Sequence, residues 1–389
     1  MGGVSMEWKE VKIGDLGQII TGKTPKTAIK KNWGGKIPFL SPSDDMSNKT
    51  SPVTARTLTE LGVAEVAKCL IPANSICVSC IGSDLGKVVK TDRELVTNQQ
   101  INTIVPHSNV DSDFVYYLMC IVGKELNYIS KTSTAVPIIN KSTFSDWNIV
   151  IPEKVEDQRR IASILSSLDR KIELNNKINA DLEEMAQAIF KNWFVDFEPF
   201  KDDKFVDSEL GMIPEGWKVG TLGELCNFKR GKNLLTKNAI DEGVPVVAGG
   251  LEPSCYHNVA NTGAPVITVS GSGANAGFMG MYHVPVWASD CSFIDVSCEN
   301  FYFVYCFLKV NSKLLKHAQT GAVQPHVKPS DIHDFELVIP DKESIFDFQD
   351  KVKPFFDKIA SIQKENSRLS LLRDTLLPRL MSGELEVPE

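Results

Sequence analysis

The chain has 389 residues, of which 42% are apolar and 23% charged, and its formal net charge is −7. This composition is typical of globular proteins, and the length is enough for two domains of ordinary size. No apolar run reaches the roughly 20 residues that a membrane-spanning helix requires, and residues 1–9 are not expected to act as a secretory leader, because they lack its charged-then-apolar pattern. The nine cysteines form no disulfide-like framework. A membrane protein and a disulfide-stapled secreted protein are excluded, and a cytoplasmic location is expected.

Residues 17–24, GQIITGKT, match the phosphate-binding pattern G-x-x-x-x-G-K-[ST]. A P-loop NTPase is therefore one hypothesis. In a phosphate-binding loop this motif follows a β-strand and opens into a helix whose free N–H groups face the phosphates. Here Pro25 follows directly, and glycines interrupt the residues that should form the strand. We interpret the match as fortuitous and keep nucleotide hydrolysis as an alternative.

The same N-terminal region is rich in lysine. Residues 9–36 contain seven lysines against Glu10 and Asp15. A local basic stripe matters more to a phosphate backbone than the net charge of the whole chain. Such lysines are also typical of an ordinary solvent-exposed face. The stripe alone therefore does not decide between a phosphate-binding surface and a face that contacts only solvent.

Residues 77–80, CVSC, lie in a strand-like run, NSICVSCIG. A C-x-x-C pair can bind metal or take part in redox chemistry, but a structural metal site usually needs further ligands. No second pair accompanies it, and the six histidines show no H-x-x-x-H spacing. We predict buried cysteines that act as small hydrophobic residues, and no metal site.

The chain contains two related copies of one unit. WKEVKIGDLGQIITGK (8–23) and WKVGTLGELCNFKRGK (217–232) are identical at six of sixteen positions at an offset of 209. TSTAVPIINKSTFSDWNIVIP (132–152) and TGAVQPHVKPSDIHDFELVIP (320–340) share seven of 21 residues at an offset of 188. The second copy keeps Gly-Lys but loses the other phosphate-loop residues. These matches indicate a tandem duplication whose unit is too long for a solenoid repeat.

Each copy is followed by a segment in which seam residues recur at alternating spacings of three and four. This heptad pattern predicts two long helices that pair as a coiled coil. The first seam contains Ile161, Leu165, Leu168, Ile172, Asn175, Asn179, Leu182, Ala186, Ile189 and Trp193. The second contains Val352, Phe355, Ile359, Ile362, Asn366, Leu369, Arg373, Leu376 and Leu380. The alternative is two amphipathic helices, each packed on its own domain.

The first of these helices ends in FKNWFVDFEPF (190–200), which has five aromatic residues in eleven. Two interpretations are open. The aromatic side chains can form a cap that packs onto the helix pair or the next domain. They can also form a docking surface for partner subunits, because aromatic residues are enriched at interface hot spots.

At this point the sequence resembles the specificity (S) subunit of type I restriction–modification enzymes, over nearly its whole length. The residues that carry the resemblance are GKTP (22–25), WGGKIPFLSPSD (33–44), INKSTFSDWNIVIPEKVEDQRRIASIL (139–165), AIFKNWFVDFEPF (188–200) and LLRDTLLPRLMSGELEV (371–387). The last two segments are the specific motifs. In the second copy, VPVVAGG (244–250) is the looser counterpart of IPFLSPSD.

The resemblance implies an α+β fold with two related mixed α/β target-recognition domains, separated by two long helices that form an antiparallel coiled coil with pseudo-twofold symmetry. The expected division is 1–152 for the first recognition domain, 153–195 for the first spacer helix, 196–214 for a linker, 215–340 for the second recognition domain, 341–381 for the second spacer helix and 382–389 for a C-terminal tail. Each recognition domain is expected to read one half of a bipartite double-stranded DNA target.

The resemblance also implies the partners. Methyltransferase (M) subunits, expected to be two, would dock on the spacer helices and use S-adenosylmethionine, and motor-nuclease (R) subunits would use ATP and Mg²⁺. The expected partner-binding residues are Phe190, Trp193, Phe194, Phe197, Leu376 and Leu380. No cofactor is expected on this chain, which lacks the Asp/Asn-Pro-Pro-aromatic segment that adenine methyltransferases need. A scaffold that assembles partners without reading sequence is the remaining alternative.

Candidate DNA-binding residues follow from chemistry, since phosphates require cations, amides or hydroxyls and base edges require paired donors and acceptors. In the first copy they are Lys23, Thr24, Lys26, Lys30, Lys31, Lys36, Asn98, Gln99, Gln100, Thr132, Thr134, Asn140 and Lys141. In the second they are Lys229, Arg230, Lys232, Ser270, Ser272, Asn275, Gln319, Thr320, Gln324, His326 and Lys328. The glycine-rich SGSGANAG (270–277) is either a loop that approaches the DNA backbone or a tight turn.

Overall fold

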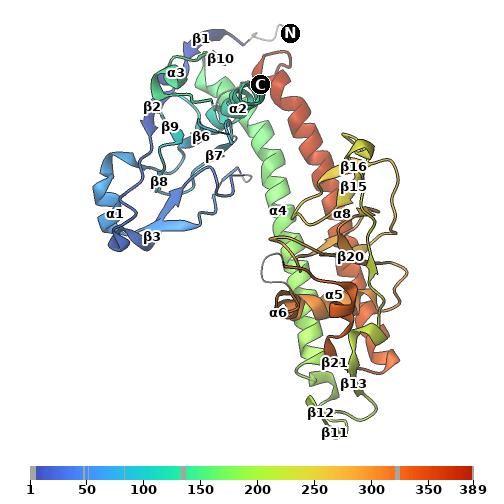
Figure 1. The fold of residues 1–389 in the computed structure, drawn as a ribbon. Coiled ribbons are helices and arrows are strands. Elements are labelled where there is room, and N and C mark those ends of the chain that lie inside the picture. Colours follow the sequence, from blue (N-terminus) through green and yellow to red (C-terminus); the bar gives the residue numbers. More distant parts are fainter. Residues whose placement is uncertain are drawn as a thin grey trace. The chain divides into compact units, whose positions relative to one another are not determined.

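The computed structural model describes residues 6–46, 49–50, 52–82, 84–132, 137–319 and 325–387. The chain divides into two compact units (Figure 1). Unit 1 comprises Met1–Leu174 and Asn366–Glu389, and unit 2 comprises Asn175–Glu365. Two helices of 40 residues, α4 (Val155–Phe194) and α8 (Lys342–Met381), each contribute one part to unit 1 and the other part to unit 2.

Unit 1 combines small sheets with helices. Its sheets have the strand orders β1-β10, β2-β9-β6-β7 and β4-β3-β8-β5. The strands are β1 (Trp8–Lys12), β2 (Gly17–Thr21), β3 (Trp33–Leu40), β4 (Arg56–Leu58), β5 (Leu70–Ile71), β6 (Ile76–Ser79), β7 (Val88–Lys90), β8 (Leu95–Thr97), β9 (Ile101–Pro106) and β10 (Asn148–Pro152). The helices besides α4 and α8 are α1 (Glu60–Glu65), α2 (Ser112–Thr132) and α3 (Lys141–Ser145).

The core of unit 1 lies between the β2-β9-β6-β7 sheet and the helices. Phe114 and Tyr117 of α2 are buried together with Leu165 of α4 and Leu380 of α8. The expected partner-binding residue Leu380 is therefore a core residue, and Leu376 packs against the same cluster while half-buried. Strand β6 pairs with β9 and β7 along its two edges, and all four of its residues are buried, so both of its faces are covered as well.

Unit 2 has a comparable set of elements. Its sheets have the strand orders β11-β12, β13-β21, β14-β20-β17-β18 and β16-β15-β19. The strands are β11 (Phe205–Ser208), β12 (Gly211–Pro214), β13 (Lys218–Thr221), β14 (Lys229–Arg230), β15 (Val244–Val247), β16 (Cys255–His257), β17 (Val266–Ser270), β18 (Met279–Tyr282), β19 (Trp287–Ala288), β20 (Cys291–Asp295) and β21 (Glu336–Ile339). The helices are α5 (Phe301–Val310), α6 (Ser312–His317) and α7 (Pro329–His333).

The aromatic segment at the end of α4 packs inside unit 2. Phe190 and Phe194 are 2% and 8% exposed. The ring of Phe190 lies 5.2 Å from that of Phe303 on α5 and 5.6 Å from that of Phe348 on α8, measured between centroids. Trp193 and Phe197 are half-buried around the same cluster. Of the two interpretations of this segment, the packed cap is the one that the structure has, and Phe190 and Phe194 offer no exposed docking face.

The two long helices run antiparallel within each unit. In unit 2 the Asn175 amide donates to Glu365 Oε2 at 2.9 Å, whereas Phe190, farther along α4, meets Phe348, which lies earlier in α8. In unit 1 the guanidinium of Arg373 binds the Asp169 carboxylate at 2.8 Å.

Asp341 precedes α8 and accepts from the backbone N–H of Ser344 at 2.8 Å, as a helix cap does.

The Gly17–Thr24 segment does not form a phosphate-binding loop. Gly17–Thr21 is strand β2, which pairs with β9 across the register Gly17↔Pro106. After Thr21 the chain turns, and the next helical residues form the short 3-10 helix Lys30–Asn32. Because Gly22–Thr24 do not lead into an α-helix, the segment lacks the strand–loop–helix geometry that a P-loop NTPase requires. In the part of the chain that the structure describes, no helix is long and apolar enough to cross a membrane.

Candidate nucleic-acid interface

The Gly-Lys pair that both copies keep occupies the same structural position in each unit. In unit 1, Gly22 follows β2, and its N–H donates to the Ile101 carbonyl at 3.1 Å. The N–H of Lys23 donates to the Thr97 carbonyl at 2.9 Å. A Cβ atom on Gly22 would lie 2.2 Å from the Asn98 carbonyl oxygen. Only glycine allows the backbone to approach this loop so closely.

Unit 2 repeats this arrangement at the end of β14. The N–H of Gly231 donates to the Cys291 carbonyl at 2.8 Å, and that of Lys232 to the Ala288 carbonyl at 2.9 Å. A Cβ atom on Gly231 would lie 2.2 Å from the Ser289 carbonyl oxygen. In both units the dipeptide therefore places the strand end directly against a neighbouring loop, and both lysine side chains are exposed.

A second recurring feature is the turn after the buried strand β6 in unit 1 and after β17 in unit 2. The N–H groups of Gly86 and Gly277 donate to the carbonyls of Ser79 and Ser270, each at 2.9 Å. Both glycines have positive φ, +89° and +77°. The segment 270–277 therefore forms a tight turn, and 79–86 is its counterpart in unit 1.

The strands β15 and β3 also correspond. β3 pairs antiparallel with β4 and parallel with β8, and β15 pairs antiparallel with β16 and parallel with β19. VPVV (244–247) thus occupies in unit 2 the place that IPFL (37–40) has in unit 1, although the two sequences are only loosely alike.

The structure brings Lys23 and Thr24 together with the predicted amide residues. The Thr24 hydroxyl donates to Gln99 Oε1 at 2.7 Å. Asn98 is buried, and its amide donates to Gln100 Oε1 at 2.9 Å while its own Oδ1 accepts from the Gln100 N–H. Asn98 therefore stabilises the turn, and Gln99 is the exposed amide of the three.

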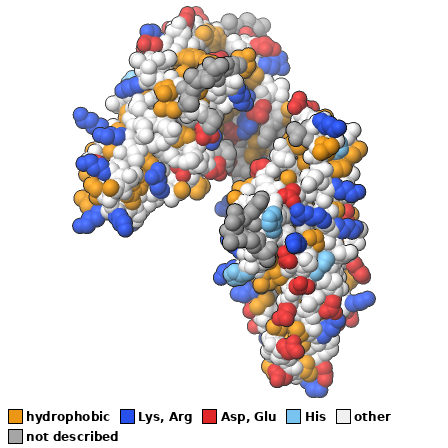
Figure 2. Space-filling view, in the orientation of Figure 1, with side chains coloured by type: hydrophobic (Ala, Val, Ile, Leu, Met, Phe, Trp, Pro, Cys, Tyr) orange, Lys and Arg blue, Asp and Glu red, His pale blue; other side chains and the backbone are white. Residues whose placement is uncertain are grey.

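The predicted basic stripe of unit 1 is exposed. Its members are Lys23, Lys26, Lys30, Lys31 and Lys36. Among the described residues, none of these five lysines forms an ion pair with an acidic side chain. Lys and Arg side chains gather at the end of unit 1 that carries α1 and β3 (Figure 2). Sequence analysis missed two further exposed cations of this region, Arg56 and Lys68, because they lie outside the lysine-rich run.

The other candidates of unit 1 lie around α3. Asn140 caps this helix and accepts from the Thr143 N–H at 2.9 Å, so its side chain has a structural role. Lys141 is exposed. Thr132 is the last residue of α2, and Thr134 lies outside the described residues.

In unit 2 the candidates meet at Asp290, a residue that sequence analysis did not single out. The Asp290 carboxylate binds the guanidinium of Arg230 and accepts from the Ser272 hydroxyl. Ser272 in turn forms a β-bridge with His326. No local pattern connects residues so far apart in the chain, which is why the cluster was not predicted.

The remaining candidates of unit 2 have different surroundings. Lys229 and Lys328 are exposed, Asn275 is half-buried and Ser270 is buried. The Gln319 amide donates to the Ala276 carbonyl at 2.8 Å. Thr320 and Gln324 lie outside the described residues.

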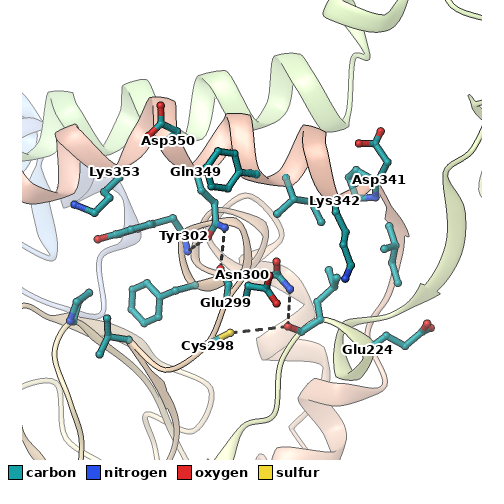
Figure 3. A pocket seen from close by; sticks show the side chains of 18 of the residues that line it. Glu224, Cys298, Glu299, Asn300, Tyr302, Asp341, Lys342, Gln349, Asp350 and Lys353 are labelled. Atoms are coloured by element: carbon teal, nitrogen blue, oxygen red, sulfur yellow. Dashed lines mark hydrogen bonds between the residues drawn. The ribbon is translucent and has the colours of Figure 1, made fainter.

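A groove of about 1030 Å³ runs beside the first turns of α8 in unit 2 (Figure 3). Gln349 spans it, because its Oε1 accepts from the Tyr302 N–H and its amide donates to the Glu299 carbonyl, both at 3.0 Å. A smaller groove of about 300 Å³ lies at the matching place in unit 1. There Gln158 of α4 accepts from the Asp111 N–H at 3.1 Å and donates to the Pro152 carbonyl at 3.0 Å.

Neither the cysteine pair nor the carboxylates of the described residues form a metal centre. No group of three or more His, Cys, Asp or Glu side chains in the described ranges is arranged to hold an ion. Cys77 and Cys80 are buried, and burial raises the pKa of their thiols to about 12 and about 11. The two cysteines are therefore unreactive core residues, as predicted.

Comparison with known proteins decides the family. The model of the type I restriction modification DNA specificity domain matches residues 6–184 and 214–370. The chain is 32% identical to the type I restriction enzyme MjaIX specificity subunit of Methanocaldococcus jannaschii, over 100% of this chain and 96% of that protein. The chain belongs to the type I restriction–modification specificity subunit family.

Other members of the specificity subunit family support the assignment. The HindI specificity subunit of Haemophilus influenzae is 26% identical over 97% of this chain and 100% of that protein. The crystal structure of the type I restriction–modification S subunit from M. genitalium superimposes with a TM-score of 0.55 at 20% identity, covering 100% of this chain and 98% of that chain. This likeness shows that the chain and that S subunit share the same overall fold.

Proposed function

We propose that this chain recognises a bipartite DNA sequence, with one target-recognition domain for each half-site. The first domain would comprise residues 1–152 and the second residues 215–340. The observation that carries the proposal is the recurrence, in both units, of the same seated Gly-Lys pair and the same turn after a buried strand. Such recurrence fits a tandem duplication in which two similar domains make similar contacts to two DNA segments.

DNA contact would begin with phosphates. The exposed lysines of unit 1 and Lys229, Lys232 and Lys328 of unit 2 can neutralise backbone charge. Polar side chains near them, among which Gln99 is exposed, can then reach base edges. Arg230 would contact DNA while Asp290 holds its guanidinium in place.

The long helices would act as spacers, 153–195 and 341–381, that pair as an antiparallel coiled coil and set the distance between half-sites. A helix of 40 residues is roughly 60 Å long at 1.5 Å per residue. That length limits the separation to about 17 base pairs if the helix lies along the duplex, given a rise of 3.4 Å per base pair.

Methyltransferase subunits would dock on the spacer helices, and the two Gln-spanned grooves offer matching surfaces for two copies of one partner. Each groove includes the first turns of a long helix, α4 in unit 1 and α8 in unit 2. Phe346, which is 68% exposed on the rim of the larger groove, is an apolar anchor for such contact. S-adenosylmethionine would bind to the methyltransferase, ATP and Mg²⁺ to a motor-nuclease subunit, and this chain would carry out no catalysis.

A salt titration tests DNA contact by the basic stripe. The full chain, co-purified with its methyltransferase subunit, is titrated with duplex DNA at several salt concentrations. The double variant Lys30→Ala/Lys31→Ala should reduce the slope of log K against log [salt] by about one to two, because each lost phosphate contact removes about 0.9. The matched control is Lys201→Ala, which removes an exposed lysine from the segment after α4.

Two results of this titration would contradict the proposal. An unchanged slope in the double variant would show that the stripe does not contact phosphates. Wild-type binding that depends on salt but shows no preference among sequences would instead support the scaffold alternative.

A further inference from the structure

Arg56 has surroundings that differ from those of the other exposed cations of unit 1. It is the first residue of β4, and its Cα pairs with that of Phe39 on β3. Its guanidinium carbon lies 4.8 Å from the centroid of the Trp33 ring and 4.9 Å from that of Phe39. The two rings meet edge to face, with centroids 5.2 Å apart and planes at 86°. One guanidinium is thus held against two aromatic rings.

This contact fixes the guanidinium without using its hydrogen-bond donors. A cation over an aromatic ring is attracted by the electrons of the ring face, and the planar group keeps a defined orientation. Phe39 is completely buried, so its ring cannot move aside. Arg56 itself is exposed, and within the described residues it forms no ion pair with an acidic side chain. Since no acceptor among the described residues takes a hydrogen bond from the Arg56 guanidinium either, its N–H donors can face an external acceptor.

Arg56 also lies beside the basic stripe. The indole N–H of Trp33 donates to the Lys26 carbonyl at 3.5 Å. Lys30 and Lys31 lie in the short 3-10 helix Lys30–Asn32 immediately before Trp33, and the hydroxyl of Thr59, the residue after β4, donates to the Lys31 carbonyl at 2.6 Å. A polyanion held by these lysines would place its groups within reach of the fixed guanidinium.

We propose that Arg56 is a specificity-determining residue that reads a guanine in the half-site bound by unit 1. Guanine presents two acceptors, O6 and N7, side by side in the major groove, and the parallel donors of a guanidinium match them. A fixed guanidinium could also bind a phosphate with two donors, but that contact would be the same for every sequence, so the test below measures discrimination between bases and not affinity alone. The inference rests on the proposed function and deepens it by assigning a base contact to one residue.

The test measures discrimination at each base position. The full chain with its methyltransferase subunit binds competing duplexes in which the unit 1 half-site is varied one position at a time and the other half-site is fixed. Arg56→Ala should lose roughly ten- to hundred-fold discrimination for guanine at one position. Arg56→Lys keeps the charge without the planar fork, so it should retain the salt slope and keep only part of the discrimination for guanine. The control is Arg93→Ala, which removes an exposed arginine paired with Asp92.

The outcomes separate the inference from the proposed function. Full discrimination at every position in Arg56→Ala, or uniform weakening on all sequences, would overturn the assignment of Arg56 while leaving two-site recognition intact. Discrimination equal to wild type in both Arg56→Lys and Trp33→Leu would also overturn it, because neither the planar fork nor its aromatic support would then be needed. A wild-type chain without sequence preference would overturn the proposed function and this inference together. If Arg56→Ala fails to fold, Arg56→Lys and Trp33→Leu, which removes the larger supporting ring, give the same readout.

Discussion

The ion pair between Asp169 of α4 and Arg373 of α8 should be a main determinant of the stability of unit 1. The Asp169 side chain is 7% exposed, and it accepts from Arg373 Nη1 at 2.8 Å and from the Tyr117 hydroxyl of α2. The pair therefore joins both long helices to the helix that carries much of the core. Arg373 also binds Asp374, whose side chain is 51% exposed.

Replacing Arg373 with methionine should leave the buried carboxylate of Asp169 with one neutral hydrogen-bond donor, the Tyr117 hydroxyl. Breaking a fully buried ion pair costs about 3–5 kcal/mol. Because the Arg373 side chain is 30% exposed, water reaches part of the site, and we expect a loss of about 2–4 kcal/mol. The control Asp374→Asn removes the exposed partner and should cost at most about 1 kcal/mol.

Hydrogen exchange measured by mass spectrometry suits a chain of two units, for which a single melting temperature is not well defined. Arg373→Met should lower the protection of peptides from 155–174 and 366–381 and leave peptides from α5 unchanged. The double variant Asp169→Asn/Arg373→Met should recover part of the protection, because the uncompensated charge is gone. Equal effects of Arg373→Met and Asp374→Asn would refute the reasoning.

Three further predictions follow. Gly22→Ala and Gly231→Ala should each lower the thermal stability of their own unit, since the new Cβ would lie 2.2 Å from a backbone oxygen; wild-type stability of either variant would contradict the seated geometry. Burial lowers the pKa of His283 despite the nearby carboxylates Asp357 and Glu183, so the stability of unit 2 should be complete above about pH 6.5 and fall as the pH drops below it. His283→Gln should flatten that dependence in urea unfolding at several pH values, and an equal slope in both proteins would argue against it. Inserting seven residues in register into both α4 and α8 should lengthen the unspecified gap by about 3 base pairs, because seven residues add about 10.5 Å; a methylation map with an unchanged gap would remove the spacer role.

Sequence patterns could predict the features that depend on local periodicity. The heptad spacing indicated two long helices, and α4 and α8 are each 40 residues long. The Gly-Lys pair could be recognised in both copies of the sequence, but the structural cause of its repetition could not. The loops against which Gly22 and Gly231 lie are distant in the chain, and the close approach becomes apparent only when the strands are paired.

Other features could not be predicted because they depend on contacts between distant residues. Asn98 seemed suited to base reading, yet it is buried in a turn. Asp290 has no motif, but it organises Arg230 and Ser272. The contact of the Arg56 guanidinium with the Trp33 ring joins β3 and β4, whose pairing shifts register between Trp33 and Ile37. Residue type indicated which groups can bind DNA, and only the fold determined which of them are already engaged.

The proposed function requires one chain to carry two DNA-reading domains, one for each half-site. It is tested most directly by mapping methylated adenines in DNA from cells that express this chain together with its methyltransferase subunit. The account predicts methylation within a split motif, with two specified half-sites and an unspecified gap of constant length. Methylation at an ungapped site, or no methylation beside an intact partner, would contradict it.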